Sequence, residues 1–214
     1  MVKTQATKPD WREARRRSAR DAIVVAAWTL VEREGLAALS LRDLAREAGI
    51  STPTVYAYFD SKNAIYDAMF GQAAEQFTAY MAAIPDSGNV RADLAAALRG
   101  FATFCTASTP RYQLLFQRTV PGFEPSAESY AHAVAALDIA RLRLGEVGVT
   151  DPRQVDLWTA MTVGLVDQQI SNDPHGDRWL SLVDDAVEMF LTHCLPTSTS
   201  TSPTRAATRE RARR

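Results

Sequence analysis

The residues best suited to chemistry lie in one short stretch, 48–62, which reads AGISTPTVYAYFDSK. Serine and threonine hydroxyls stand just ahead of two tyrosines, and a lysine closes the stretch. Hydroxyls donate and accept hydrogen bonds, and an ammonium group attracts phosphate as a point charge. The stretch therefore offers binding groups, and the question is which partner such groups would touch.

Catalytic motifs are missing from the remainder of the sequence, which has no HExxH, GxSxG, Walker loop or paired CxxC. An enzyme would need a nucleophile with its base, or a cluster of metal ligands, at recognisable spacing. Asp173, His175 and Asp177 lie close together, but a polar loop of turn residues explains them better than a metal site. We predict a protein that is not an enzyme and that holds no metal or other cofactor.

The composition allows a sizeable core, because 46% of the 214 residues are hydrophobic. No apolar run approaches the ~18 residues that a membrane span needs, and no signal peptide is visible. Only two cysteines, Cys105 and Cys194, occur, so a disulfide framework is not expected. We expect a reduced, cytoplasmic protein without a membrane partner.

Charge is distributed unevenly along the chain. Residues 1–62 hold 11 Lys and Arg against 8 Asp and Glu, residues 63–195 hold 8 against 16, and residues 196–214 hold 5 against 1. A basic end on an acidic body suggests a polyanion as the partner of that end. The alternative is that the arginines of 12–20 form only a solvated helix face.

Hydrophobic spacing predicts an all-α protein of about nine helices, because no long run alternates as a strand would. Ile23, Ala26, Ala27, Leu30 and Val31 share one face of a helix over 11–34, and Gly35 is suited to end it. The predicted organisation is as follows: a flexible arm over 1–9, an N-terminal three-helix domain over 10–60, a C-terminal helical bundle over 61–195, and a disordered basic tail over 196–214.

Two short helices, 41–48 and 52–58, joined by a tight glycine turn, have the spacing of a helix-turn-helix. On the second helix Val55 and Phe59 point inward, whereas Pro53, Thr54 and Ala57 point outward. A helix with so small an outer face fits the DNA major groove, which is about 12 Å wide. An ordinary helical hairpin is the alternative interpretation of the spacing alone.

Residues 20–68 resemble the DNA-binding domain of the TetR family of bacterial transcriptional regulators. The elements that carry the resemblance are Ile23, Ala26–Ala27, Leu30, Gly35, Ser40, Leu44–Ala45, Ala48–Gly49–Ile50–Ser51, Val55–Tyr56, Tyr58–Phe59 and Ser61–Lys62. The resemblance implies a homodimeric repressor that binds a palindromic, double-stranded DNA operator and is released by a small-molecule effector. The DNA-contacting positions it implies are Ser40, Arg42, Thr52, Pro53, Thr54, Tyr56, Ala57, Tyr58 and Lys62.

The predicted recognition helix departs from the family pattern in two ways. Position 57 is alanine, where many members carry a larger residue, and the outer face has no Arg, Lys, Asn or Gln. Bidentate reading of guanine or adenine requires those side chains. We therefore expect Arg42 to read one guanine in each half-site, and Thr54, Pro53 or Ala57 to contact thymine methyl groups.

The C-terminal part is expected to supply the dimer contact and the effector site. Because 154–170 and 178–194 have the widest apolar faces, we predict a dimer interface at Leu165, Val166, Gln169, Leu180, Val183, Val187 and Phe190; these stripes would otherwise complete the core of one chain. We predict a hydrophobic or aromatic effector in a cavity lined by Phe101, Phe104, Tyr112, Phe116, Phe123, Tyr130, Trp158 and Met161, where plain core packing is the alternative. An architectural DNA-binding protein of the same fold, without an effector, is the second functional interpretation.

Overall fold

The computed structural model describes residues 11–195, and within this range it is all-helical, without any strand. The elements are α1 (Trp11–Glu34), η1 (Leu36–Ala38), α2 (Leu41–Glu47), α3 (Thr52–Tyr56), α4 (Lys62–Ala82), α5 (Val90–Thr106), α6 (Thr109–Phe116), α7 (Ala127–Glu146), α8 (Pro152–Asn172), η2 (Leu180–Leu182) and α9 (Val183–Cys194). The prediction of an all-α fold with about nine helices is therefore confirmed. The predicted arm over 1–9 and tail over 196–214 lie outside the described residues.

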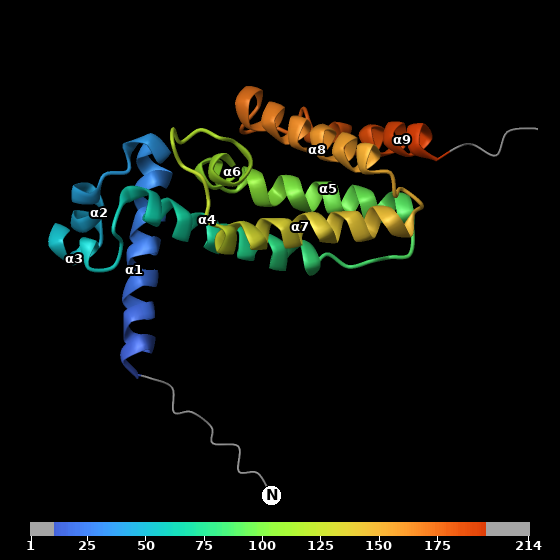
Figure 1. The fold of residues 1–214 in the computed structure, drawn as a ribbon. Coiled ribbons are helices and arrows are strands. Elements are labelled where there is room, and N and C mark those ends of the chain that lie inside the picture. Colours follow the sequence, from blue (N-terminus) through green and yellow to red (C-terminus); the bar gives the residue numbers. More distant parts are fainter. Residues whose placement is uncertain (1–10, 196–214) are drawn as a thin grey trace, which may run out of the picture.

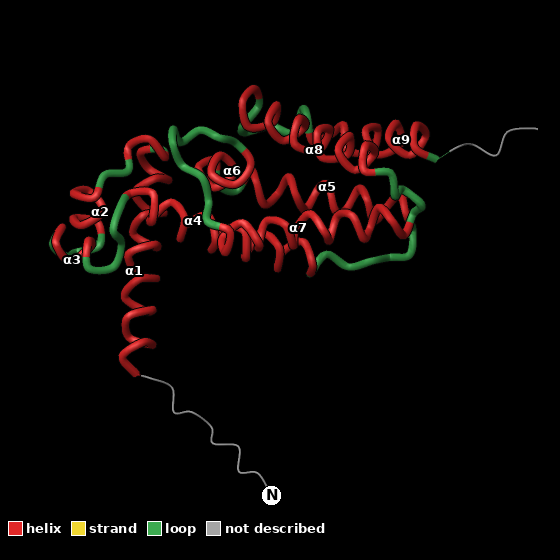
Figure 2. The backbone as a smooth tube through the Cα atoms, in the orientation of Figure 1, coloured by secondary structure: helices red, strands yellow, loops and turns green. Residues whose placement is uncertain are grey.

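Two groups of helices make up the structure (Figure 1). Helices α1, α2 and α3 gather at one end, and α4 runs from there into the larger body. In the body α4 and α7 lie side by side, α5 packs beside them, and α8 and α9 form an outer layer against α5. Loops and turns of different lengths join these helices (Figure 2), and the longest lies over 117–126 between α6 and α7. No helix in the described range has the length and hydropathy to span a bilayer.

Local sequence signals define the first helices. Gly35 has φ +82° and its amide donates to the Val31 carbonyl at 2.8 Å, so α1 ends where glycine tolerates the left-handed region. Ser40, Ser51 and Ser61 are the N-cap residues of α2, α3 and α4, and each hydroxyl accepts the amide three residues further on. These caps fix the start of each short helix, which positions the helix-turn-helix.

The first buried cluster joins the N-terminal helices to the start of α4. Its α4 members include Ile65, Tyr66, Met69 and Phe70, which pack with the buried faces of α1, α2 and α3. The predicted domain boundary after residue 60 therefore falls immediately before a helix that both groups share. A displacement of α4 would therefore act directly on α1, α2 and α3.

The second buried cluster fills the body and changes the interpretation of α8 and α9. Five residues predicted at a dimer interface are buried within a single chain, with exposed fractions of 2% or less: Val166, Gln169, Val183, Val187 and Phe190. Leu165 and Leu180 are partly buried against the same cluster. These stripes complete the protomer core, so the prediction that they contact a partner is wrong for the buried five.

Gln169 shows why a polar residue belongs in that core. Its side-chain nitrogen donates to the carbonyls of Asp173 and Gly176, and its side-chain oxygen accepts the amides of Trp179 and Leu180 at 3.0 and 3.3 Å. One buried amide thus pairs the backbone groups of the loop between α8 and α9. Gln169 organises that loop rather than a subunit contact.

Candidate nucleic-acid interface and ligand cavity

Helices α2 and α3 form a helix-turn-helix whose turn is closed by backbone hydrogen bonds. Gly49 has φ +67°, and the Ile50 amide donates to the Ala45 carbonyl at 3.0 Å. Val55 and Phe59 have exposed fractions of 0%, so the inner face of the segment is anchored as the sequence predicts. The outer face is consequently held toward solvent in a fixed orientation.

The predicted DNA-contacting residues occupy that outer face, or border it. Arg42, Pro53, Tyr56 and Ala57 are exposed, whereas Ser40, Thr52, Thr54, Tyr58 and Lys62 are partly buried. The regular part of α3 ends at Tyr56, two residues earlier than expected, which is within the usual variation at helix ends. The small and mildly polar outer surface that the sequence indicates is therefore present.

Two of the predicted contact residues already use their hydroxyls within the chain. The Ser40 hydroxyl accepts the Asp43 amide at 3.1 Å and donates to the Asp43 carboxylate at 2.5 Å. This hydrogen bond, more than the neighbouring arginines, lowers the pKa of Asp43. The Thr54 hydroxyl lies 2.7 Å from the Ser51 hydroxyl that caps α3. The hydroxyls of both residues therefore already have hydrogen-bond partners at the helix caps.

Two cations lie close to aromatic rings at the edges of the helix-turn-helix. The Arg20 guanidinium stands 4.5 Å from the centre of the Phe59 ring, and the Lys62 ammonium 5.4 Å from the centre of the Tyr66 ring. Such contacts orient a cation without neutralising it. Sequence reasoning treated the arginines of α1 as one group and did not single out Arg20, because stacking across elements leaves no local pattern.

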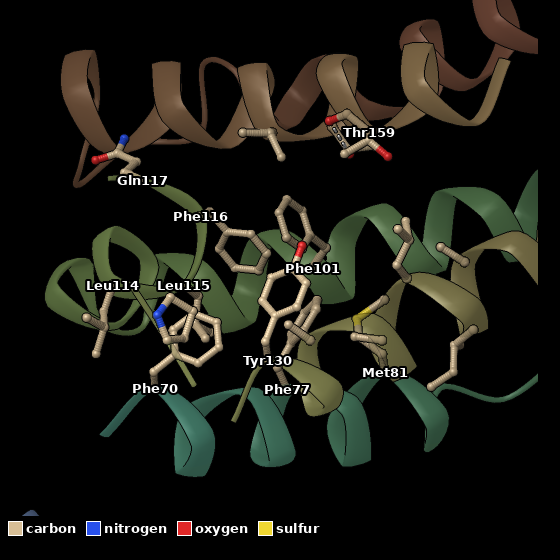
Figure 3. Close-up of a pocket in the computed structure, with 18 of the residues that line it drawn as sticks. Phe70, Phe77, Met81, Phe101, Leu114, Leu115, Phe116, Gln117, Tyr130 and Thr159 are labelled. Atoms are coloured by element: carbon tan, nitrogen blue, oxygen red, sulfur yellow. Dashed lines mark hydrogen bonds between the residues drawn. The ribbon is translucent and has the colours of Figure 1, made fainter. Parts of the chain in front are cut away.

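A cavity of about 780 Å³ lies in the body. Its lining residues come from α4, α5, α7 and α8, and also from the end of α6 and the loop over 117–126. Helix α6 lies on the side of the body nearest the helix-turn-helix (Figure 1). Figure 3 shows Phe101, Phe116 and Tyr130 between α8 and α4, with Phe70 and Met81 toward opposite ends. The size is typical of sites for small organic ligands.

Five of the eight predicted effector contacts line this cavity: Phe101, Phe116, Phe123, Tyr130 and Trp158. The other three do not. Phe104 packs on Phe77 and Tyr80, Tyr112 is buried beside Asp167, and Met161 lies against the core. Burial raises the pKa of Tyr112 to about 12, which agrees with its place behind the cavity wall.

Sequence reasoning missed the wall that α4 supplies. Phe70, Phe77 and Met81 line the cavity, and they follow one another at spacings of seven and four residues, which places them on one helix face. That spacing could have revealed them. The predicted lining was drawn only from positions between Phe101 and Met161, so the aromatic face of α4 was left out.

Few polar groups line the cavity, and most of them already form hydrogen bonds within the chain. The hydroxyls of Thr159 and Thr162 donate to backbone carbonyls of α8, and the Gln117 amide donates to the Asp167 carboxylate at 2.6 Å. The charged residues on the wall are Arg118, Glu124 and Arg143. The wall thus suits an apolar molecule with a polar group at one place.

No set of three or more His, Cys, Asp and Glu side chains that could hold a metal ion occurs within residues 11–195. In the loop after α8 the Asp173 carboxylate accepts the Arg178 amide at 2.9 Å, so Asp173 has a structural partner. Burial raises the pKa of the Cys105 thiol far above its usual range, which makes Cys105 an inert core residue.

The geometry defines a class: a helix-turn-helix domain at one end of a helical body that contains a cavity. Residues 23–69 match the family described as bacterial regulatory proteins, tetR family. The resemblance recognised in the sequence is thereby confirmed over these residues. The chain carries this domain on the fold of TetR-family transcriptional regulators.

Curated relatives match part of the chain. The HTH-type transcriptional regulators EthR of Mycobacterium tuberculosis and Mycobacterium bovis are 41% identical over 76 residues, which is 34% of this chain. The match spans 35%, about a third, of the length of those relatives. The similarity in sequence to these relatives thus extends over about a third of the chain.

Solved structures are similar over most of the chain. A protein of unknown function from Rhodococcus sp. RHA1 has a TM-score of 0.70 at 21% identity, covering 90% of this chain and 99% of that one. The transcriptional regulator FadR from Bacillus subtilis, in complex with stearoyl-CoA, has a TM-score of 0.62 at 18% identity, covering 80% and 97%. At such identities the likeness shows the fold.

Proposed function

We propose that the protein is a sequence-specific transcriptional repressor, which binds a palindromic operator as a homodimer and is released by a hydrophobic or aromatic ligand. The observation that carries the proposal is the exposed outer face of α3, held by the fully buried Val55 and Phe59. Small side chains on that face allow close approach to the base edges in a major groove.

Direct reading of bases falls mainly to Arg42, because the outer face of α3 has no side chain suited to bidentate hydrogen bonding. Arg42 is exposed near the start of α2. Pro53 and Ala57 supply apolar contacts to thymine methyl groups. Tyr56, which is 54% exposed, and Lys62 at the first turn of α4 contact the phosphate backbone.

A homodimer follows from the limited reach of one recognition helix, since a second copy related by a two-fold axis doubles the contact and explains a palindromic site. With the main stripes of α8 and α9 buried, the candidate surface is their outer side. Leu157, Leu182 and Met189 are 43%, 39% and 64% exposed there. We assign the dimer contact to these residues.

Ligand binding reaches the DNA-binding helices through Phe123 and Tyr66. Phe123 lines the cavity, and its ring centre lies 5.6 Å from that of Tyr66 and 6.5 Å from that of Phe70. The buried Tyr66 hydroxyl donates to the Leu36 carbonyl at 2.6 Å, in the turn between α1 and α2. A ligand that moves Phe123 therefore acts on the residues that orient the helix-turn-helix.

Helix α6 makes a second connection between the cavity and α1. Ser108, which caps α6, hydrogen-bonds the Glu32 carboxylate of α1. The Arg111 guanidinium lies 5.8 Å from the Trp28 ring centre of α1 and 5.3 Å from that of Phe104 on α5. Ligand affinity that differs between the DNA-binding conformation and another one would shift the population away from DNA.

Selection of genomic fragments by the purified protein tests the proposal. We expect the bound fragments to share an inverted repeat, because two recognition helices read the same half-site in opposite directions. Bound fragments without a common motif, at about 0.15 M salt, would favour the architectural alternative and contradict the repressor assignment.

A further inference from the structure

Arg143 is a cation on a largely apolar cavity wall. Its Nη2 group donates to the carbonyls of Met81 and Ile84, at 3.2 and 2.7 Å, where α4 ends. Within residues 11–195 it forms no salt bridge with a carboxylate, and its Nε and Nη1 groups donate no other hydrogen bond. The side chain is thus held in place while part of its hydrogen-bonding capacity stays available.

The cavity extends along α4 from Phe70 to Met81 (Figure 3). These residues are eleven positions apart, which corresponds to about 16 Å along a helix. Arg143 stands at the Met81 end, and Phe123 lies against Phe70 at the other. A ligand anchored at Arg143 would therefore have to cross the apolar length of the cavity to reach Phe123.

We propose that the ligand is an elongated amphiphile with a carboxylate head at Arg143 and an unbranched apolar tail that extends toward Phe123. The proposal rests on the proposed function and names the ligand class of its cavity. A guanidinium pairs with carboxylate by charge-assisted hydrogen bonds, which are stronger in a partly buried site than in water. The apolar wall supplies the remaining affinity through burial of the tail.

Arg118 is the competing anchor, and its surroundings differ. Arg118 and Glu124 both line the cavity from the loop over 117–126, and both are exposed. A carboxylate head beside Arg118 would also meet the charge of Glu124 and the screening of solvent. Arg143 is partly buried and belongs to the end of the cavity far from that loop. The structure therefore favours Arg143.

This arrangement makes the effect of the ligand on DNA binding depend on the length of its tail. With carbon–carbon bonds of about 1.5 Å, a tail of roughly a dozen carbons spans the distance from Arg143 to Phe123. Shorter carboxylates would bind at Arg143 and leave Phe123 where it is. Only tails of sufficient length would push on the Phe123–Tyr66 contact and release DNA.

Calorimetric titration of the full-length protein with straight-chain carboxylates and the matching primary alcohols, of about six to eighteen carbons, tests the ligand class. We expect each long carboxylate to bind at least about tenfold more tightly than the alcohol of equal length. Equal affinity for acid and alcohol, or no binding by either series, would overturn the proposal.

Two matched variants locate the head. Arg143→Gln keeps a donor for the α4 carbonyls but loses the charge, and Arg118→Gln makes the same change at the exposed position. We expect about a tenfold loss of carboxylate affinity in Arg143→Gln only, with alcohol affinity unchanged. Loss in Arg118→Gln alone would place the head at the other end and overturn the assignment. Thermal melting of both variants without ligand checks that they fold.

DNA release, measured on the operator found by genomic selection, separates this proposal from the proposed function. We expect carboxylates shorter than about a dozen carbons to bind without releasing DNA, and longer ones to bind and release it. Release by every carboxylate that binds would overturn the length requirement and leave the repressor assignment standing. Failure of the protein to select any operator would instead contradict the repressor assignment, while the calorimetric comparison would still decide the ligand class.

Discussion

Aromatic side chains serve opposite purposes in the two parts of the molecule. In the N-terminal part Phe59 and Tyr66 are at most 1% exposed, and both belong to one buried cluster. In the body Phe101, Phe116 and Trp158 surround an open volume of about 780 Å³. Close packing holds a recognition surface in one orientation, whereas a hollow core lacks contacts that a ligand can restore. Under the proposed function, the first part reads DNA and the second responds to a ligand.

The largest expected effect on stability comes from removing one aromatic ring from the N-terminal part and, for comparison, one from the body. Phe59→Ala should lower the free energy of unfolding by about 3–5 kcal/mol and abolish DNA binding, because the ring is fully buried. Phe116→Ala should cost less, since Phe116 is only partly buried and faces the cavity. Urea denaturation measures both losses, and equal losses would contradict the contrast between a filled and a hollow core.

Gln169 and Leu157 separate folding from dimer formation on the same helix. Gln169→Leu should lower the free energy of unfolding by about 1–3 kcal/mol, because it leaves backbone groups of the following loop without partners. Leu157→Ser removes an exposed side chain and should weaken only the dimer. Sedimentation equilibrium and denaturation at several protein concentrations distinguish the two. A dimer that Leu157→Ser leaves unchanged would move the interface elsewhere.

Arg42 and Lys62 should contribute to DNA binding in different ways. Arg42→Ala should cost about 1–3 kcal/mol and relax base selectivity at one position of each half-site. Lys62→Gln should weaken binding to all sequences alike and reduce the salt slope by about one unit. Titrations against single-base operator variants at several salt concentrations measure both. Unchanged base preference in Arg42→Ala would contradict direct reading by that residue.

Tyr66→Phe has the smallest expected effect on stability, about 1 kcal/mol at neutral pH, from loss of the hydrogen bond to Leu36. Burial raises the pKa of Tyr66 to about 12, above the value of about 10 that is usual for tyrosine. The folded state therefore favours the neutral hydroxyl of Tyr66. The stability that this preference contributes is fully present below pH 10 and is lost as the pH rises from 10 through 12.

The alkaline loss of stability should be shallower in Tyr66→Phe than in the wild type, and urea denaturation between pH 9 and pH 12 provides the test. Tyr112, whose pKa is also raised to about 12 by burial, keeps part of the dependence in the variant. Identical alkaline profiles for the two proteins would show that the Tyr66 hydroxyl is not buried as the structure places it.

The N-terminal part could be predicted from the sequence because its signals are local. Glycines at 35 and 49 end helices at positive φ, serines at 40, 51 and 61 cap the next ones, and the inward positions 55 and 59 follow from helical spacing. Each signal acts within about one helical turn. The fold class therefore followed from the residues alone.

The body could be predicted only in outline, because an apolar helix stripe looks the same whether it meets its own chain or a partner. Val183, Val187 and Phe190 gave such a stripe, and the structure buries them within the protomer. Aromatic composition likewise could not separate Phe101, on the cavity wall, from Phe104 behind it. That distinction depends on how α4, α5, α7 and α8 are arranged, which is information of long range.

The most direct test of the central claim compares two labelled duplexes of equal length and base composition by fluorescence anisotropy. One carries the inverted repeat recovered by selection, and the other carries the same bases scrambled. At about 0.15 M salt we predict that the wild-type protein binds the repeat at least about 1,000-fold more tightly, with two protomers per duplex. Equal affinity for both duplexes, or one protomer per repeat, would contradict the account of a dimeric reader.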